Sequence, residues 1–348
     1  MSEKFRGYPA KVMEVEPSFD EVNRLFYERG LTDGFPIVPP TQEKVRAYLD
    51  ALGREPTELV GVVVPASGMA TVEKIVINAI MAGCEPAHVP VVIAATEAMC
   101  DPAFNLDAIQ TTTNPATVAL TVNGPIRKQL DINCGRNCLG QGWKANATIG
   151  RAVRLILNNI GGGKPGDPDK SMHGFPGKYS MCFGEDEEGS PWTPFHVDEG
   201  FRREDSAVTV TAINSTVNLG LSNFLDIDGM LRATGYAIGY YGNPNSTSGG
   251  GRPVIALTRG HATMAAAAGM SKLQVKQLLF DLHGFPEAKL PPMVRKERLI
   301  IYDGVVKSAR KPEDILIVVC GGPETYHAVY MPTFAASAPQ TRAIVPLA

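Results

Sequence analysis

The stretch Ile315-Leu316-Ile317-Val318-Val319-Cys320-Gly321-Gly322-Pro323 decides the fold class, because an unbroken apolar run leads directly into a glycine turn. A short apolar run bounded by turn residues is typical of a buried strand. Two further runs end in the same way, residues 118–122 before Asn123-Gly124 and residues 254–257 before Arg259-Gly260. Helix-like segments separate these strands, and this alternation predicts an α/β fold. We expect a mixed or parallel sheet with helices on both faces.

Periodicity and composition divide the chain into three parts. Residues 1–55 are expected to form a helical lead-in, in which Ser18 and Glu21 make a capping box. Residues 56–205 are expected to form an α/β subdomain with a long acidic loop, and residues 206–348 a second α/β subdomain. Helices are expected over 71–82, 91–99, 147–159 and 215–240, with a helical turn after Pro323. The glycine- and proline-rich stretch 160–205 is expected to be irregular, and so long a loop is usually functional or mobile.

Composition excludes several classes of protein. The 348 residues carry 33 Lys and Arg against 36 Asp and Glu, a net charge of −3, which leaves no broad basic surface for nucleic acid. No apolar run approaches a bilayer span and the N-terminus has no secretory signal, so we expect no membrane association and a cytoplasmic location. Six cysteines in so long a chain do not indicate a disulfide scaffold. GxxxxGK[ST] does not occur, and the one GxGxxG match, Gly161 to Gly166, follows an expected helix and lacks the strand–loop–helix order of a nucleotide site. We therefore expect no cofactor and no metal.

The strand-to-glycine junctions are the first candidate positions for a site, because ligands of open α/β sheets bind beyond the carboxyl ends of strands. Cys320 follows a strand directly, and a helix N-terminus after it would lower the pKa of its thiol and make it a nucleophile. An inert buried thiol is the alternative. Gly321 and Gly322 would let the backbone approach a substrate. His261 and His327 also follow strands or turns and are candidate bases, although each alone is typical of local hydrogen bonding.

The stretch 182–196 is the second candidate region, since four consecutive acidic residues ending at Glu188 precede Trp192, Phe195 and His196. Aromatic neighbours desolvate a carboxyl group and raise its pKa, as a general acid requires. Glu188 and His196 are therefore the first candidates for proton transfer. A solvated acidic turn is the usual alternative, and a metal site is a weaker one.

Polar residues near the start of an expected helix are candidate substrate ligands. Lys144, Asn146 and Arg151 follow a glycine turn, where the helix dipole disfavours cations. An anionic substrate would explain them, and a salt bridge to the acidic loop at residues 182–192 would explain them equally well. Cys134 and Cys138 have a CxxxC spacing that suits neither a zinc site nor a typical redox pair, so this segment is expected to be a loop that contacts substrate.

Three segments resemble a largely uncharacterised bacterial family, and the resemblance extends over nearly the whole chain. They are Leu31-Thr32-Asp33-Gly34-Phe35-Pro36-Ile37-Val38-Pro39-Pro40-Thr41, Trp143-Lys144-Ala145-Asn146-Ala147-Thr148-Ile149-Gly150-Arg151 and the loop from Glu185 to Trp192. Members of this family are often encoded beside small proteins that carry selenocysteine or cysteine in a UGSC-type motif. The resemblance implies a partner with a reactive thiol or selenol, but it assigns no active-site residue. The chain has no CGSC sequence, and Cys320-Gly321-Gly322-Pro323 comes nearest to it.

These features together predict an enzyme of lyase or hydrolase type, or the large subunit of a hetero-oligomeric enzyme. It would cleave a carbon–heteroatom bond in a small polar or anionic substrate by acid/base or thiolate-assisted chemistry, with Cys320 as nucleophile. The alternative is a noncatalytic substrate-binding subunit that serves a thiol or selenol redox partner. In both cases we expect an oligomer. The enzymatic interpretation requires the glycine junctions and the acidic segment to assemble into one cavity.

Overall fold

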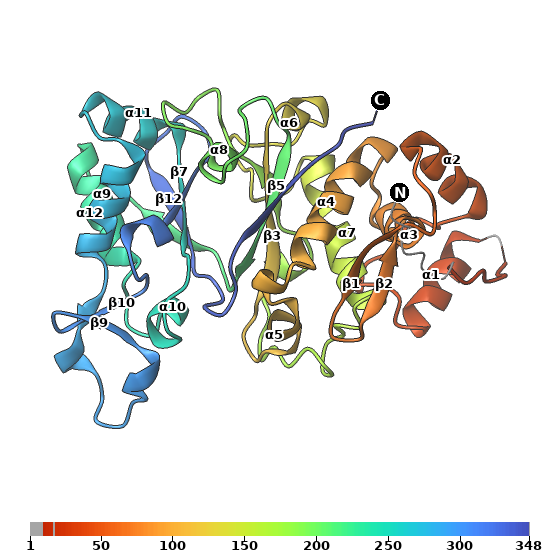
Figure 1. Ribbon diagram of the computed structural model, residues 1–348, viewed down its shortest axis with the longest axis horizontal. Helices are drawn as coiled ribbons and strands as arrows, with labels where there is room; N and C mark the ends of the chain where they lie inside the picture. Colours follow the sequence, from red (N-terminus) through yellow and green to blue (C-terminus); the bar gives the residue numbers. More distant parts are fainter. Residues whose placement is uncertain (1–9, 17, 348) are drawn as a thin grey trace, which may run out of the picture.

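The computed structural model describes residues 10–16 and 18–347, and in these residues two four-stranded sheets stand face to face between layers of helices (Figure 1). The central sheet has the order β13-β5-β3-β4, with bounds Gln340–Ala343, Ala207–Ile213, Thr117–Asn123 and Cys182–Gly184. The second sheet has the order β11-β7-β12-β6, with bounds Leu316–Val319, Val254–Leu257, His327–Met331 and Val217–Gly220. Each sheet is mixed, because β3 and β4 pair in parallel, as do β7 and β11, and the other pairs are antiparallel. The chain has an α/β fold.

Smaller elements extend this framework at both ends. A hairpin of β1 (Leu59–Val63) and β2 (Gly68–Thr71) lies on the N-terminal side, and β8 (Phe285–Pro286), β10 (Val305–Lys307) and β9 (Ile300–Tyr302) form a small antiparallel sheet. Of the described helices, those before the second sheet are α1 (Phe19–Glu28), α2 (Gln42–Leu52), α3 (Val72–Ala82), α4 (Val89–Met99), α5 (Leu106–Thr111), α6 (Ile126–Gln129), α7 (Lys144–Asn159) and α8 (Phe195–Asp198). The others are α9 (Ile227–Ala237), α10 (Pro244–Thr247), α11 (Arg259–Ala267) and α12 (Lys272–Leu282).

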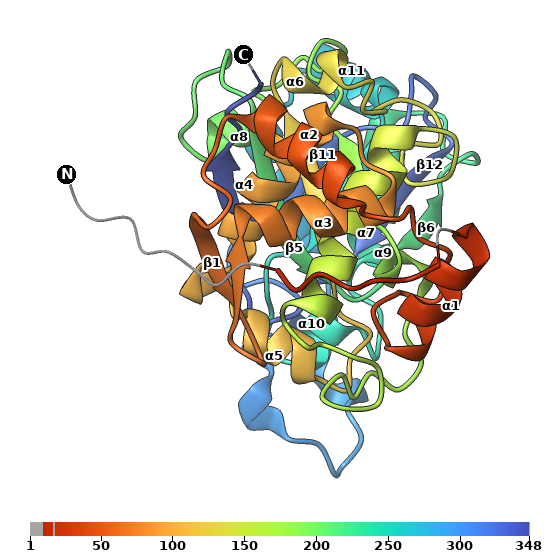
Figure 2. The same cartoon turned by 90° about the vertical axis from the view of Figure 1, so that its right-hand side faces the viewer.

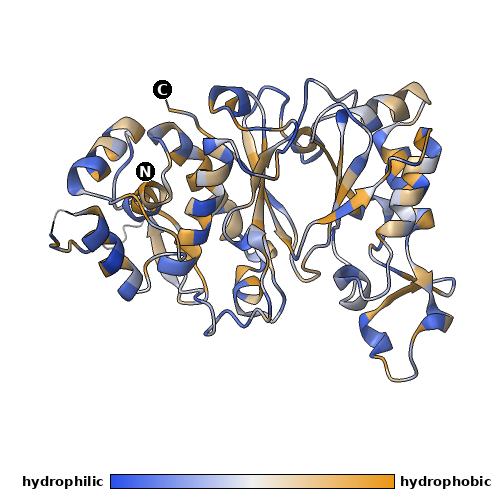
Figure 3. Cartoon of the chain, turned by 180° about the vertical axis from the view of Figure 1, so that it is seen from behind, coloured by the Kyte–Doolittle hydropathy of each residue, from blue (hydrophilic) through white to orange (hydrophobic). Residues whose placement is uncertain are grey.

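The helices cover the outer face of each sheet. Helices α4 and α7 pack against the central sheet and α3 packs on both of them, and Figure 2 looks onto this helical side. Helices α9, α11 and α12 cover the outer face of the second sheet (Figure 1). Strands β3, β5, β7 and β11 are buried throughout, as is expected for strands that are covered on both faces, and Figure 3 shows hydrophobic residues along the sheets.

The two-residue period of the strands divides their side chains between separate cores. In β3, Leu120 and its neighbours two residues away contribute to the core under the helices, whereas Ala119 contributes to the core between the sheets. In β11, Ile317 and Val319 face the helices, and Val318 faces the other sheet. Cys320 continues the series of Val318 and lies on the face between the sheets. The strand pattern therefore places this thiol in the interior that the two sheets share.

Most helices begin where their capping residues predict. Ser18 Oγ accepts a hydrogen bond from Glu21 N, and Thr71 caps α3 through the amide of Lys74. The helix expected over 91–99 is confirmed as α4, with a proline in its first turn. No helix in the described residues combines the length and apolar composition needed to cross a bilayer.

Three local predictions were wrong because short strands carry little periodic signal. Only the C-terminal part of the expected helix 215–240 is helical, since Val217–Gly220 forms β6. The segment after Pro323 is not a helical turn, because it leads into β12, which pairs with β6 and β7. The stretch 160–205 contains β4, which is only three residues long. Strand β5 begins just after the expected boundary at residue 205, but it pairs with β3, which lies before that boundary. The division into subdomains stays a prediction.

We expect Leu120→Ala to lower the free energy of unfolding by about 2–5 kcal/mol, because Leu120 is fully buried and its truncation leaves a cavity under the helices. Denaturant unfolding measures the change. Leu225→Ala is the control, since Leu225 is 91% exposed and its truncation should change stability by less than about 0.5 kcal/mol. Equal effects of the two substitutions would contradict the assignment of Leu120 to the core.

Candidate active site between the two sheets

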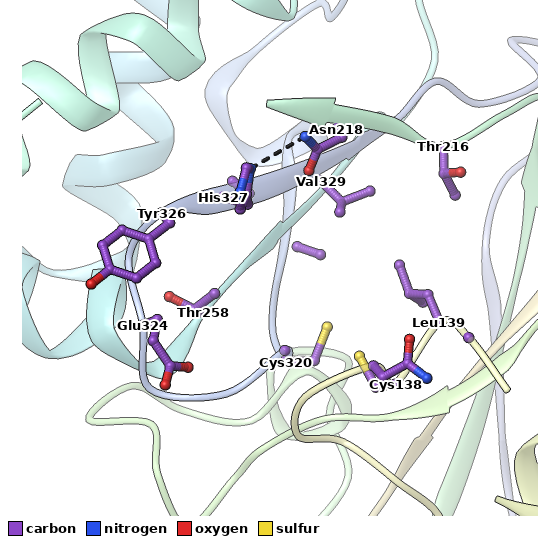
Figure 4. A pocket seen from close by; sticks show the side chains of 15 residues that line it. Cys138, Leu139, Thr216, Asn218, Thr258, Cys320, Glu324, Tyr326, His327 and Val329 are labelled. Atoms are coloured by element: carbon purple, nitrogen blue, oxygen red, sulfur yellow. Dashed lines mark hydrogen bonds between the residues drawn. The ribbon is translucent and has the colours of Figure 1, made fainter. Parts of the chain in front are cut away.

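A cavity of about 730 Å³ lies between the sheets at the carboxyl ends of β7 and β11 (Figure 4). The loop 137–140 forms its wall on the side of the central sheet. The second sheet contributes Thr258 and Cys320 at its strand ends, and β6 and β12 contribute Asn218 and His327. The position agrees with the general rule that ligands of α/β proteins bind beyond the carboxyl ends of strands.

Two cysteines from opposite sides meet in this cavity. Cys138 and Cys320 both line it, both are buried, and their sulfur atoms lie on facing segments (Figure 4). The backbone fastens the two segments together, because Gly321 N donates to Cys134 O at 2.9 Å. The sequence pattern indicated Cys320 as the nucleophile, whereas Cys138 was expected only as part of a loop that contacts substrate.

The contact between the thiols gives them different acidities. The Cys320 thiol donates a hydrogen bond to the sulfur of Cys138, and this bond lowers the pKa of Cys138 in spite of its burial. The amides of Cys138 and Leu139 add to the effect. Cys320 has a pKa well above its usual value, because it is the donor in this bond and because burial disfavours its thiolate. Cys138 is therefore the thiol that ionises first.

The expected activation of Cys320 was wrong for a structural reason. That expectation required a helix N-terminus directly after Cys320, and the chain instead turns through Gly321 and Gly322 toward β12. Both glycines have positive φ, +101° and +103°, which residues with a side chain rarely adopt. A Cβ at Gly322 would also lie 2.8 Å from Arg136 Cγ. Gly321 lines the cavity, whereas Gly322 supports the turn behind it.

Asn146 positions the loop that carries Cys138. Its Oδ1 accepts a hydrogen bond from Asn133 N at 2.8 Å, and its Nδ2 donates to Asn133 O at 3.1 Å and to Cys138 O at 3.3 Å. Asn146 is buried in α7 and does not line the cavity. Asn146, predicted as a substrate ligand, thus holds the loop of Cys138 by its backbone.

His327 lies in the same cavity as the thiols and is held by β6. Its Nδ1 lies 3.2 Å from Asn218 Nδ2, and β6 and β12 are antiparallel neighbours (Figure 4). With the Asn218 amide as donor, Nδ1 is the acceptor and the ring proton is on Nε2. His327 is exposed, so Nε2 is available to donate a proton to a group bound in the cavity.

His261 has a local structural role. Its Nδ1 lies 2.8 Å from Thr258 Oγ1 in the capping box of α11, and its Nε2 lies 3.0 Å from Thr325 O. Burial lowers its pKa to about 4, so the ring is neutral near pH 7. Both nitrogens are occupied by groups that shape the turn around Thr258, and His261 itself does not line the cavity.

The acidic segment from Glu185 to Glu188 bridges the two sheets beneath the site, and we refer to it as the bracket. Glu185 N donates to Val122 O at the end of β3, and Asp186 N donates to Val319 O at the end of β11. The carboxylate of Glu187 accepts hydrogen bonds from Gly124 N at 2.7 Å and from Asn123 Nδ2 at 3.0 Å. This segment therefore sets the spacing of the sheets at the level of the cysteines.

Arg127 stabilises the bracket by ion pairs with its carboxylates and a hydrogen bond to its backbone. Its guanidinium is 2% exposed and contacts Glu187 at 3.0 Å, Glu188 at 3.1 Å and the backbone oxygen of Glu185 at 2.5 Å. Glu188 also pairs with Lys128. Partial burial raises the pKa of Glu188, but the hydrogen bonds from Lys128 and Arg127 outweigh it and the net pKa is lowered. Glu188 is half exposed and acts as an ion-pair partner here.

Glu185 is the carboxyl group whose pKa is raised. Burial is the main cause, and the charge of Lys272 and the hydrogen bonds from Phe195 N and Asn123 Nδ2 oppose it only in part. Its Oε1 has no partner among the described residues. A carboxyl group with a raised pKa was expected in this segment at Glu188, but it is Glu185 whose pKa is raised.

His196 is enclosed in α8 beside the bracket. It is fully buried, its ring nitrogens lie near the backbone of Arg202 and Arg203, and neither makes a well-aligned hydrogen bond with a described residue. Burial lowers its pKa, although the charge of Glu187 opposes this. Like Glu188, it does not line the cavity.

Lys144 and Arg151 of α7 form ion pairs, but their partners are not carboxylates of the bracket. Lys144 pairs with Glu85 at 2.7 Å on the surface, and Arg151 pairs with Asp33 at 2.8 Å while donating to Pro36 O. Neither lines the cavity. The structure thus brings Cys320, Gly321 and His327 together with Cys138. Glu188, His196, His261, Gly322 and Asn146 lie outside the cavity wall, and Lys144 and Arg151 make ion pairs on the other side of the central sheet.

No group of three or more His, Cys, Asp or Glu within residues 10–16 and 18–347 has the arrangement of a metal site. No protein-family model, curated protein or solved structure matches the chain. The functional interpretation therefore depends on the geometry of the cavity and on the acidity of its thiols.

We expect Cys320→Ala to move the alkylation of Cys138 to higher pH. The substitution removes the hydrogen bond that lowers the pKa of Cys138, so a smaller fraction of Cys138 is thiolate at pH 7. The rate of iodoacetamide labelling against pH, followed on the Cys138 peptide by mass spectrometry, measures the shift. Cys84→Ala is the control, since Cys84 lies in the core under the helices. An unchanged profile in Cys320→Ala would refute the proposed contact.

Glu185→Gln and Glu188→Gln should change stability in opposite directions at neutral pH. The raised pKa of Glu185 favours folding below the unfolded pKa of about 4.3, and this contribution is lost as the pH rises through the folded pKa. Glu185→Gln should therefore become more stable than wild type as the pH rises to 7. The lowered pKa of Glu188 stabilises the fold above about pH 4.3, so Glu188→Gln should lose stability at pH 7 but not in acid. Thermal unfolding at pH 4 and pH 7 distinguishes the two.

Proposed function

We propose that this chain is an enzyme of hydrolase or lyase type, or the larger subunit of a hetero-oligomeric enzyme, that cleaves a carbon–heteroatom bond in a small polar substrate. The observation that supports this best is the pair Cys138 and Cys320 facing each other in a cavity that His327 also lines. A thiol with a lowered pKa and a proton donor in the same cavity are the two parts that thiolate-assisted cleavage needs.

Cys138 is the nucleophile in this proposal. Its thiolate attacks the electrophilic carbon, a carbon–sulfur bond forms, and the bond to the heteroatom breaks with its electron pair on the heteroatom. His327 supplies the proton to that leaving group from Nε2 in its doubly protonated form, in which Nδ1–H donates to Asn218 Oδ1 after rotation of the amide, and the ring is left neutral. In the hydrolase form a water molecule, losing its proton to His327, then displaces the sulfur and regenerates the thiolate. Cys320 is a positioning residue that stabilises the Cys138 thiolate by its hydrogen bond.

The cavity favours a neutral polar substrate over a strongly anionic one. Thr258, Asn218 and Thr216 offer hydroxyl and amide groups, and Glu324 adds a carboxylate. The cations that the sequence analysis assigned to substrate, Lys144 and Arg151, are paired elsewhere. A volume of about 730 Å³ is within the usual range for small-molecule sites.

We expect wild-type protein incubated with pools of small amides, esters and amines to form a covalent adduct on Cys138, seen by intact and peptide mass spectrometry. Cys138→Ala should form none, and His327→Gln should slow turnover by about 100-fold or more, because a general acid contributes at least that much. His261→Gln is the comparison, since His261 does not face the cavity. Full turnover in Cys138→Ala would overturn the proposed mechanism.

A different outcome would favour the noncatalytic alternative. If the isolated chain forms no adduct but co-purifies from its host with a stoichiometric protein bearing a thiol or selenol, the chain is better described as the substrate-binding subunit. Tyr326, 59% exposed at the edge of the cavity, would then lie where that partner approaches. Mass photometry of the native complex measures the stoichiometry and tests the expected oligomer.

A further inference from the structure

A second cavity, of about 450 Å³, lies on the other side of the central sheet between α7 and the loop 163–179. Arg154 and Asn158 line it from α7, four residues apart and so on one helix face, and Asp169 and Lys178 line it from the loop. It shares none of its lining residues with the cavity of the cysteines.

Arg154 is a buried cation without a carboxylate partner. Its side chain belongs to a residue that is 7% exposed, its Nε donates to Lys178 O at 2.7 Å, and its Nη2 donates to Thr117 Oγ1 at 3.2 Å. In the described part of the chain, no carboxylate forms an ion pair with it and Nη1 has no protein acceptor. Burial lowers the pKa of Arg154, and the more distant charges of Asp169 and Asp33 offset this only in part.

The other charges around this cavity are already paired. Lys178 Nζ contacts Asp169 Oδ2 at 2.7 Å, and Arg151 forms two hydrogen bonds with the carboxylate of Asp33. One positive charge, that of Arg154, is therefore left over. Burying an unpaired charge is costly, and an anion bound in the cavity would remove that cost.

Two buried polar atoms also lack partners at the cavity. Asn158 is 6% exposed and its Oδ1 has no hydrogen bond with a described residue, and Ser171 Oγ has none either. Asn158 Oδ1 can only accept, and because it is closed off from solvent, its amide must rotate toward the cavity before a bound molecule can donate to it. Two structural carboxylates in the lining, Asp33 and Asp169, would repel a phosphate that carries nearly two charges.

We propose that this cavity binds a small organic monocarboxylate that carries a hydroxyl group, with the carboxylate on Arg154 and the hydroxyl donating to Asn158. The site is separate from the thiol cavity and does not depend on the function proposed there. A single carboxylate matches the single unpaired charge, and the hydroxyl matches the unpartnered acceptor.

Asn158→Asp tests the inference within the fold. It places a carboxylate one helical turn from Arg154, where it should pair with the guanidinium and occupy the place of the ligand carboxylate. Thermal unfolding in low salt should show this variant to be more stable than wild type. Asn223→Asp is the matched control, because it makes the same charge change at an exposed position outside both cavities. A variant less stable than that control would show that Arg154 needs no partner and would overturn the proposal.

Calorimetric titration with lactate, propanoate and inorganic phosphate tests the ligand class. Wild type should bind lactate more tightly than propanoate and either one more tightly than phosphate, and Asn158→Asp should lose at least about tenfold in lactate affinity, as expected when a charge-assisted pair is lost. Asn223→Asp should bind as wild type does. Tighter binding of phosphate, or equal lactate affinity in Asn158→Asp and wild type, would overturn the assignment, as would the absence of saturable binding of all three.

Discussion

The core shared by the inner faces of the two sheets is the constraint on which the rest of the structure depends. Residues such as Ala119, Val318 and Met331 fill it, and backbone hydrogen bonds from Asp186 to Val319 and from Gly321 to Cys134 join the sheets at its upper edge. Side chains along a strand point alternately to its two faces. When one residue faces the core between the sheets, its two chain neighbours therefore face the helices. The spacing of the sheets then determines which groups meet above the core.

Polar groups at that edge are held mainly by the backbone and by buried ion pairs. Arg127 and the carboxylates it contacts use most of their hydrogen-bonding capacity in joining the ends of β3, β4 and β11. The side-chain amide of Asn146 makes its hydrogen bonds to the backbone of the loop that carries Cys138. Such groups are costly to bury unless they are paired, and Arg127, Glu187 and Asn146 therefore lie outside the cavity that the two thiols and His327 line.

Local sequence signals predicted the capped helices and the strands with an unbroken apolar core, and missed short strands of mixed composition. Strands β7 and β11 have four residues each but are wholly apolar, whereas β4 and β6 contain glycine or asparagine and gain their stability from strand pairing. Of the candidate residues, Cys320, Gly321 and His327 line the cavity, but the facing Cys138 was not among the candidates. Its CxxxC spacing gave no signal, because its partner lies about 180 residues away in the chain.

The sequence alone determined the α/β class, the strand-end position of Cys320 and the near-neutral charge, because these depend on periodicity, turn residues and composition. Only the tertiary structure decided which thiol is acidic and which charges are left unpaired. Acidity at Cys138 depends on a hydrogen bond across two sheets, and the unpaired charge of Arg154 depends on where Asp33 and Asp169 find their own cations. Both are contacts between distant segments, which local sequence patterns do not encode.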